Sequence, residues 1–298
     1  MAGEAVVTQA PSVPRREGAA RRAVRAVTRG PASIVLTIVG LVWLLPSFGL
    51  FVASLRSSAF NAATGWWTAL TKPSQLTLES YRALLNNPDM VRAFSNTALI
   101  TVPSALLVVL IAAMAAYAFA WMNFRGREGI FLVMVGLLVV PLQIALIPVS
   151  KLYGQIGLFG RIPGAVLYHV AFGLPFAIFL LRNFFLGIPR ELLEAARMDG
   201  AGELQTFRKV VLPLGIPAIA SLLIFQFLWV WNDLLVALVF TSTDSAPLTV
   251  VIRNQLRQFG NNINVIAPAA FIQMLVPLAV FFAFQRYFVQ GLLAGSQK

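Results

Sequence analysis

A single acidic side chain interrupts a long hydrophobic run toward the C-terminus of the chain. Asp233 follows Trp231 and Asn232 within residues 214–240. An ionisable group in such a segment is a functional candidate by default. A carboxylate, an amide and an indole can together hydrogen-bond to a sugar and stack on it. A purely structural interpretation, a hydrogen bond between helices, stays equally open for Asp233.

Two amide side chains extend this set. Gln226 lies in the same hydrophobic run as Asp233, and Gln143 lies in a charge-free run at 129–150. For each glutamine, hydrogen bonding between helices is the stronger expectation. The candidate substrate pathway therefore consists of Asp233, Asn232, Trp231, Gln226 and Gln143.

Several other kinds of site are excluded by residue type. The chain has no cysteine and one histidine, His169, so it has no thiolate site and no multi-histidine metal site. We expect His169 to hydrogen-bond between helices. A P-loop requires Gly-Lys followed by Ser or Thr, but the lysines follow Thr71, Ser150, Arg208 and Gln297. We predict no catalytic, cofactor-binding or metal-binding residue.

The elements that position these residues are membrane-spanning helices. Of the 298 residues, 58% are hydrophobic and 11% are charged, which excludes an ordinary soluble enzyme and a disordered protein. A helix needs about 20 apolar residues to cross a bilayer. We predict an all-α membrane protein with six spans, at about residues 34–55, 95–122, 129–150, 163–184, 214–240 and 266–287. We expect kinks at Pro141, Pro148, Pro175, Pro217 and Pro277.

The basic residues predict the orientation. Residues 1–30 contain six arginines, and arginine is enriched on the cytoplasmic side of a membrane. We therefore expect both termini, and the turn at 123–128, to be cytoplasmic. Residues 1–30 read as a disordered tail near anionic lipid, or as a topology signal only. The net charge of +12 thus does not indicate nucleic-acid binding.

The largest outer segment, residues 56–92, has two possible roles. Trp66 and Trp67 favour an anchor at the membrane interface, and a contact with an outside protein is the alternative. Within this segment, residues 76–86 predict a short surface helix that Thr77 could cap.

The longest inner connection, Gly187–Leu212, predicts two helices joined by a glycine corner; we call it the bracket. Pro189 suits a first helical turn, and Gly200 and Gly202 end the first helix. A second short helix follows from about Glu203 until Pro213 starts the next span. The bracket could transmit force to a partner; a connector lying flat on the membrane is the alternative.

Here the residues resemble a known motif. Glu194-Ala195-Ala196, followed by Gly200, Val210 and Leu212-Pro213, is similar to the EAA motif of the membrane subunits of binding-protein-dependent ABC importers. Val210 stands where the motif usually has isoleucine, a conservative departure. Other segments resemble the sugar branch of the family, the maltose-type permeases: Ala115–Ala120, Trp231–Asp233 and Gln285–Gly291 among them. The similarity covers nearly everything after residue 30.

The resemblance implies a fold and a set of partners. Residues 31–298 would form a transmembrane permease domain with an EAA coupling loop at 187–213. A separate cytoplasmic ATPase dimer would bind ATP and Mg, with no cofactor on this chain, and its surface cleft would grip the loop. The residues in or beside that cleft would be Glu194, Ala195, Ala196, Arg197, Asp199 and Gly200. A second, homologous permease subunit, an extracytoplasmic solute-binding protein and membrane lipid complete the expected partners.

We therefore expect the permease subunit of an ATP-driven sugar importer in a bacterial or archaeal cell membrane, with an oligosaccharide or α-glucoside as solute. An ABC permease for another solute, such as a peptide or polyamine, is the main alternative. An ion-coupled secondary transporter is disfavoured because acidic residues are nearly absent from the spans.

Overall fold

The computed structural model describes residues 19–259 and 263–296, and within them the secondary structure is helical apart from one isolated bridge between Arg56 and Leu76. The helices are α1 (Ala19–Ser54), α2 (Ser58–Ala63), α3 (Thr68–Thr71), η1 (Pro73–Gln75), α4 (Glu79–Leu85), α5 (Pro88–Trp121), α6 (Arg127–Leu137), α7 (Leu142–Gln155), α8 (Ile162–Phe185), α9 (Arg190–Met198), α10 (Glu203–Thr206), η2 (Phe207–Val211), α11 (Leu212–Trp231), α12 (Leu235–Phe240), α13 (Leu248–Phe259) and α14 (Ile263–Ser296).

The helices that can cross a membrane agree with the predicted fold class, with one difference. Among the described residues, five helices are long and apolar enough to span a bilayer, and a sixth span results only if α6 and α7 count as one. These two helices meet at an angle of 100°, whereas a single run over 129–150 was expected. Pro141 precedes the first residue of α7, where its ring prevents the helix from continuing.

The other prolines expected to kink spans lie inside continuous helices. Pro148 is in α7, Pro175 in α8, Pro217 in α11 and Pro277 in α14. A proline inside a helix removes one backbone hydrogen bond but does not end the helix when neighbouring segments compensate.

The helix α1 crosses the boundary between two compact units, Met1–Gly49 and Leu50–Lys298. It begins at Ala19, so residues 19–30 are helical where a disordered tail was expected, and residues 1–18 lie outside the described residues. The large hydrophobic side chains from Ile34 to Leu45 are exposed, as suits a helix surrounded by lipid.

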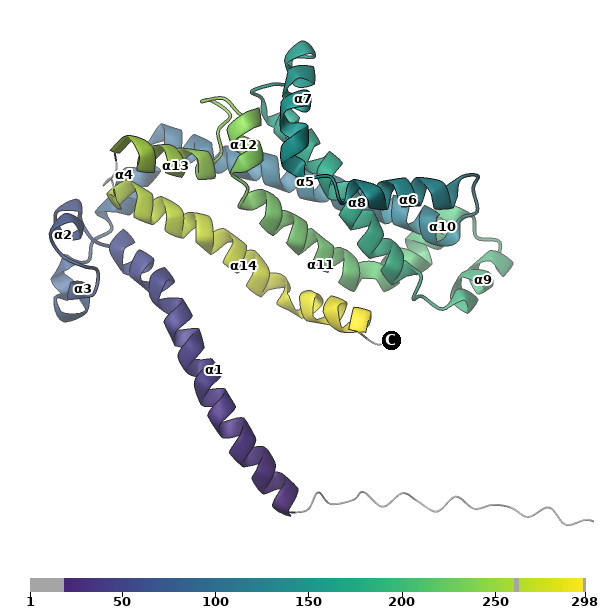
Figure 1. Ribbon diagram of the computed structural model, residues 1–298, viewed down its shortest axis with the longest axis horizontal. Helices are drawn as coiled ribbons and strands as arrows, with labels where there is room; N and C mark the ends of the chain where they lie inside the picture. The colour runs from purple at the N-terminus through teal and green to yellow at the C-terminus, as the bar shows by residue number, and fades with distance from the viewer. Residues whose placement is uncertain (1–18, 260–262, 297–298) are drawn as a thin grey trace, which may run out of the picture. The chain divides into compact units, whose positions relative to one another are not determined.

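The second unit is built around α5, α8 and α11, which pack side by side (Figure 1). Small side chains allow their backbones to approach closely: Ala112 and Ala116 on α5 and Ala177 on α8 are fully buried. At Gly173 a Cβ would lie 2.7 Å from Gln226 Nε2 and 3.0 Å from Val108 Cγ2. These helices therefore meet without room for larger residues.

The segment that follows α1 folds around a buried arginine. Arg56 is fully buried and donates hydrogen bonds to oxygens of Phe60, Asn61, Thr64, Thr68 and Gln75. None of these partners is a carboxylate, and burial lowers the pKa of Arg56 from its ordinary value. The planar guanidinium can satisfy many acceptors at once, so one side chain fixes the α2–η1 segment.

The expected surface helix is present as α4. It covers Glu79–Leu85, and the backbone N–H of Glu79 donates to Thr77 Oγ1 over 3.2 Å. The hydroxyl of Thr77 therefore satisfies one N–H at the start of the helix, but the helix begins at Glu79 and not at Leu76, and its N-cap residue is Leu78 rather than Thr77.

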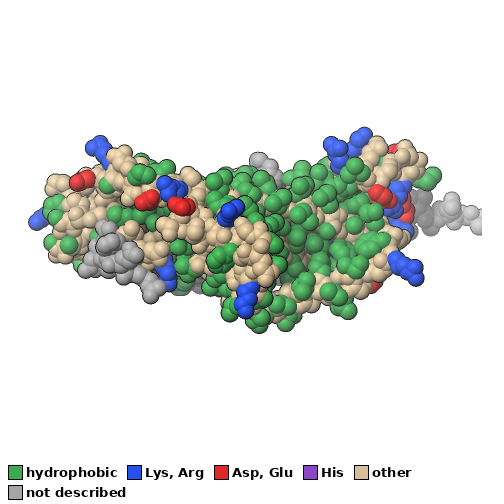
Figure 2. All heavy atoms as spheres, turned by 90° about the horizontal axis from the view of Figure 1, so that it is seen from above, with side chains coloured by type: hydrophobic (Ala, Val, Ile, Leu, Met, Phe, Trp, Pro, Cys, Tyr) green, Lys and Arg blue, Asp and Glu red, His purple; other side chains and the backbone are tan. Residues whose placement is uncertain are grey.

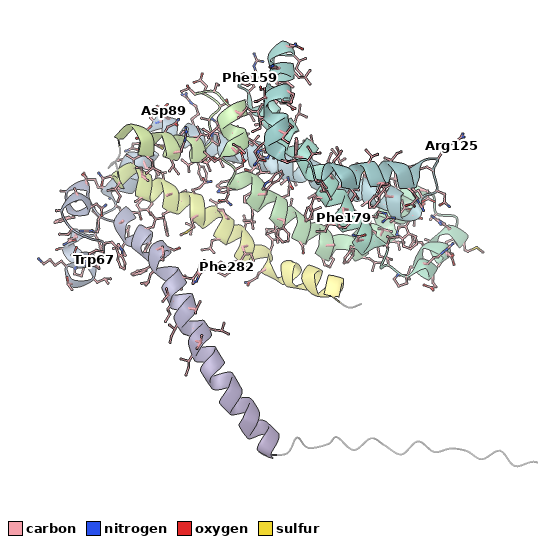
Figure 3. The ribbon with its side chains drawn as sticks, in the orientation of Figure 1. Trp67, Asp89, Arg125, Phe159, Phe179 and Phe282 are labelled. Carbon is pink, nitrogen blue, oxygen red and sulfur yellow. The ribbon has the colours of Figure 1, made fainter. Side chains whose placement is uncertain are left out.

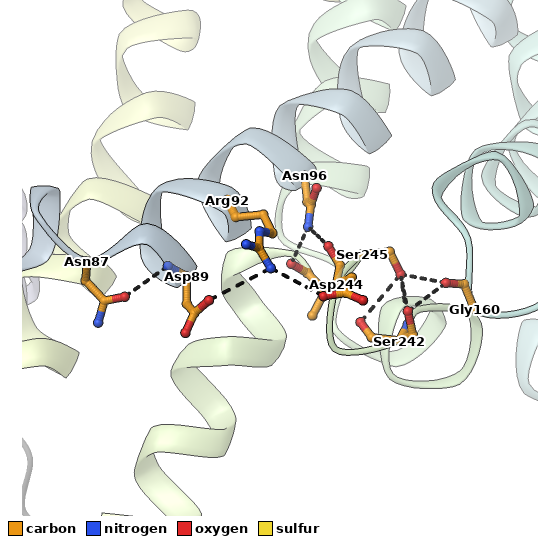
Figure 4. Close-up of polar contacts among 9 residues, drawn as sticks. Asn87, Asp89, Arg92, Asn96, Gly160, Ser242, Asp244 and Ser245 are labelled. Atoms are coloured by element: carbon orange, nitrogen blue, oxygen red, sulfur yellow. Dashed lines mark hydrogen bonds and ion pairs between the residues drawn. The ribbon is translucent and has the colours of Figure 1, made fainter.

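The loop between α12 and α13 is fixed to two other elements (Figure 4). Asn96 on α5 donates to the carbonyl oxygens of Asp244 and Ala246, over 2.9 and 3.1 Å. Ser242 and Ser245 donate to the carbonyl of Gly160, in the turn before α8, over 2.9 and 2.8 Å. The loop thus has a defined backbone conformation.

Charge and apolar surface are distributed as a membrane protein requires. Figure 2 shows a broad region of hydrophobic side chains, with most acidic and basic side chains on either side of it. Figure 3 places Trp67 and Asp89 at one end of the helical bundle and Arg125 at the opposite end. Segments 56–92 and 123–128 thus lie at opposite ends, as the alternation of spans predicts.

Candidate functional site

The glycine corner of the bracket is formed as expected. The helix α9 ends in a Schellman motif, in which Gly200 N–H donates to Arg197 O and Ala201 N–H to Ala196 O, both over 3.0 Å. Gly200 has φ +80°, a left-handed conformation that glycine adopts without steric cost. Pro189 lies one residue before α9 rather than in its first turn.

One face of α9 is anchored and the other is exposed. Leu193 is buried in the main hydrophobic core, with 1% of its surface exposed. Of the predicted docking residues, Ala196 is half-buried, and Glu194, Ala195, Arg197, Asp199 and Gly200 are exposed. Arg190 and Glu194 form an ion pair of 2.8 Å one turn apart. The predicted residues are therefore accessible for the most part, although Ala196 and Arg197 share the helix face of Leu193.

A polar network ties the bracket to α5. Tyr117 donates a hydrogen bond of 2.5 Å to Glu203 Oε2, and Arg197 forms an ion pair of 3.1 Å with the same carboxylate. Arg197 also donates to the carbonyl of Trp121 over 3.4 Å. Arg197 was predicted as a site residue from the sequence, whereas Tyr117 and Glu203 were not, because their hydrogen bond joins residues far apart in the chain.

The second helix of the bracket differs from the prediction. We expected a short helix that ends before Pro213, but residues Glu203–Trp231 form one continuous helical stretch. Its residues Phe207–Val211 adopt the wider π-helical geometry just before Pro213, which lacks an N–H for a regular bond. The bracket is therefore continuous with a membrane span.

The far end of this stretch carries Trp231. Its indole Nε1 donates to the carbonyl of Gln273 on α14 over 2.9 Å, and Gln273 Nε2 donates to the carbonyl of Trp231 over 2.8 Å. Trp231 is buried, with 3% of its surface exposed. In this structure Trp231 therefore joins two helices.

Asp233 lies at a break between helices and not in the middle of a span. The predicted continuous run 214–240 ends as a helix at Trp231, and α12 begins at Leu235. The Asp233 carboxylate accepts hydrogen bonds from the N–H groups of Val236 and Ala237, over 3.3 and 3.0 Å. It therefore caps α12, which explains how a carboxylate is tolerated here.

The remaining pathway candidates are dispersed. Asn232 is exposed and donates to Leu228 O over 2.8 Å, Gln143 is exposed on α7, and Gln226 is buried between α8 and α11 beside Gly173. Gln226 Nε2 has no hydrogen-bond partner among the described residues. The structure therefore does not unite the five candidates in one pocket.

The residue that does face Asp233 is His169. Its Nε2 lies 3.7 Å from Asp233 Oδ2, beyond hydrogen-bond distance, and its Nδ1 has no partner among the described residues. The ring packs edge-on against Trp229, with centroids 5.4 Å apart. The direct interhelical hydrogen bond expected for His169 is therefore not made to Asp233.

The chain is similar in sequence to a family of transport proteins and to two permeases. Residues 97–293 match the family described as "Binding-protein-dependent transport system inner membrane component". The osmoprotective compounds uptake permease protein GgtD of Synechocystis sp. is 48% identical over 90% of this chain and 92% of its own length. The alpha-glucoside transport system permease protein AglG of Rhizobium meliloti is 50% identical over 83% of this chain and 67% of its own length.

A solved structure shares the fold. A chain from a bacterial ABC transporter involved in the import of the acidic polysaccharide alginate superposes with a TM-score of 0.73. The two sequences are 23% identical, and the match covers 92% of this chain and 100% of the other. The arrangement of helices described above is therefore one already observed in an importer.

Proposed function

Because the chain belongs to the family of binding-protein-dependent transport system inner membrane components, we propose that it is the permease subunit of an ATP-driven sugar importer. A permease of this family is a multi-pass membrane protein and is not itself an enzyme. The proposal rests on one observation about the bracket. Leu193 anchors it in the hydrophobic core, while most residues of its EAA motif are exposed to a partner.

The proposed solute is an α-glucoside or a related small sugar derivative. Two sequence relatives near 50% identity carry the names of an α-glucoside permease and an osmoprotective-compound permease. A non-sugar solute remains an outcome of the test below.

The proposed partner of the exposed bracket face is a cytoplasmic ATPase subunit, with a dimer of that subunit binding ATP and Mg. The face combines charged groups with exposed apolar side chains: Leu192, Met198 and Leu204 have 44%, 87% and 68% of their surface exposed. Large exposed apolar side chains beside charged ones are typical of protein interfaces. Glu194, Ala195, Ala196, Arg197, Asp199 and Gly200 would lie in the contact.

The continuity of the bracket with α11 suggests how force is transmitted. Residues Glu203–Trp231 form a 29-residue helical stretch, about 43 Å long at 1.5 Å per residue. We infer that a displacement of the bracket is carried along this stretch to the break at Asp233. ATPase closure would thereby shift the equilibrium between inward and outward states. A second permease subunit and an extracytoplasmic binding protein would complete the transporter.

The experiment is purification of this chain with the proteins that bind it, followed by ATPase assays with the binding protein and a panel of solutes. The panel contains α-glucosides, other oligosaccharides, neutral osmoprotective solutes, a peptide and a polyamine. We expect ATPase co-purification and stimulation by an α-glucoside or related sugar. Stimulation by the peptide or polyamine alone would refute the sugar assignment, and absence of an ATPase would refute the importer.

A further inference from the structure

A small, partly open cavity lies where α5, α8 and the break after α11 meet. Its volume is about 10 Å³, which is close to the least that holds one water molecule. The polar side chains in its lining are those of Thr97, Thr101, His169, Trp231 and Asp233. Asp233 and His169 are the titratable groups among the lining residues.

Two polar atoms in this lining lack partners. Thr101 Oγ1 and His169 Nδ1 are buried and make no hydrogen bond to any described residue. Thr101 has 0% and His169 has 1% of its surface exposed. Buried hydroxyls and imidazoles are almost always hydrogen-bonded, so these two atoms point to a ligand that can both donate and accept.

Among the neighbouring hydroxyls on this face of α5, the lack of a hydrogen-bond partner in the described part of the chain is specific to Thr101. Ser104, one turn further along α5, donates to Ile100 O over 2.7 Å. Thr97 Oγ1 donates to Ala93 O over 2.8 Å and accepts from the N–H of Leu248 over 2.9 Å. Hydroxyls on this helix face are thus otherwise satisfied by backbone groups.

We propose that this cavity is a binding site for one structural water molecule held by Thr101, His169 and Asp233. The volume excludes a larger ligand. A metal cation is disfavoured because Asp233 is the single carboxylate in the lining, and its oxygens already accept two backbone N–H groups. Water supplies two donors and two acceptors and so suits a hydroxyl, an imidazole and a carboxylate together.

The site lies where three elements of the bundle meet. Thr101 belongs to α5 and His169 to α8, whereas Asp233 lies at the break where the stretch Glu203–Trp231 ends. The water connects that break to α5 and α8, and a water molecule can rearrange its hydrogen bonds when its neighbours move. A change of angle at the break therefore does not leave a buried polar group without a partner.

The test is the sign of the stability change on Thr101→Val, measured as the apparent Tm of the purified full-length chain with its partners. Valine has the shape of threonine without the hydroxyl. If the site binds water, the water loses a partner, and we expect Tm to fall by about 2 °C or more. If the site is dry, Thr101→Val relieves an unsatisfied hydroxyl, and Tm stays constant or rises, which would overturn the proposal.

Two controls separate the explanations. Thr101→Ser keeps the hydroxyl and should retain the water, seen as density in the cavity by electron cryo-microscopy at high resolution, whereas Thr101→Val should lose that density. Ser104→Ala removes a hydroxyl bonded within its own helix and should leave the density in place. Replacing sodium with choline should not change Tm; a sodium-dependent Tm would refute water in favour of a cation.

Discussion

Gly200 provides the sharpest test of the bracket because its conformation, and not its surroundings, demands glycine. Its φ is +80°, and a Cβ built there meets nothing within 4 Å. Any side chain therefore has space, but it must adopt a left-handed backbone that costs about 1–2 kcal/mol per non-glycine residue. In an equilibrium constant, this cost corresponds to a factor of about 5–30.

The matched control lies two residues away. Gly202 also has nothing within 4 Å of a built Cβ, but its φ of −71° and ψ of 168° suit any residue. It is the N-cap of α10, where serine is favoured over glycine. The same substitution therefore has opposite expectations at the two positions, Gly200→Ser unfavourable and Gly202→Ser neutral or slightly favourable.

The assay is the affinity of the ATPase subunit for the permease in lipid nanodiscs. The exposed corner can relax to another backbone in Gly200→Ser, and the ATPase has to restore the native one. We expect the Kd to rise by about 5–30-fold for Gly200→Ser and to stay within about twofold for Gly202→Ser. Gly200→Asn should be milder than serine, since asparagine tolerates this conformation, and Gly200→Val should be more severe.

Equal Kd values for Gly200→Ser and Gly202→Ser would refute the reasoning, since serine has to adopt a left-handed backbone at position 200 and an ordinary one at position 202. A reduced yield of both variants in the membrane would place the effect in folding. A normal yield with a selective loss at Gly200 places it in docking.

Three further predictions concern residues with defined hydrogen bonds. Arg56→Met removes the hydrogen bonds that hold residues 57–75, each worth about 1.5–3 kcal/mol. Chymotrypsin cleavage of that segment should therefore rise at least about tenfold, and unchanged cleavage would contradict the role of Arg56. Asp233→Asn keeps a capping oxygen but loses the charge, so uptake should fall while co-purification persists; full uptake removes Asp233 from the pathway. Tyr117→Phe loses a hydrogen bond to the bracket and should weaken ATPase binding, whereas Tyr81→Phe, which loses a bond to Ser54, should not; equal effects would exclude a local role for Tyr117.

Five of the six predicted spans are present as single long helices, and they were predictable because each depends on a local property, the length of an apolar run. The breaks between helices, at α6–α7 and after Trp231, were less predictable. Pro141 was expected to kink a span, but the angle of 100° between α6 and α7 depends on what each half packs against. The break after Trp231 carries no proline or glycine, so no local signal marked it. There the carboxylate of Asp233 forms the new cap.

The bracket was predictable for a different reason. Its first helix and its glycine corner follow from helix periodicity and from the backbone freedom of glycine, whereas the burial of Leu193 depends on the core against which the bracket packs. The hydrogen bond that ties the bracket to α5 was not predictable, because Tyr117 and Glu203 lie 86 positions apart. A single sequence gives no indication that two such residues meet.

The sequence by itself determined that this chain lies in a membrane, which segments cross it, and which short stretch resembles a docking motif. These are consequences of composition and of patterns within about 30 residues. Only the tertiary structure decided that the bracket continues into α11, that Arg56 is the centre of the segment after α1, and that Thr101, His169 and Asp233 share one cavity. Each depends on helices distant in sequence that pack at particular angles, because buried polar groups find their partners only when that arrangement is complete.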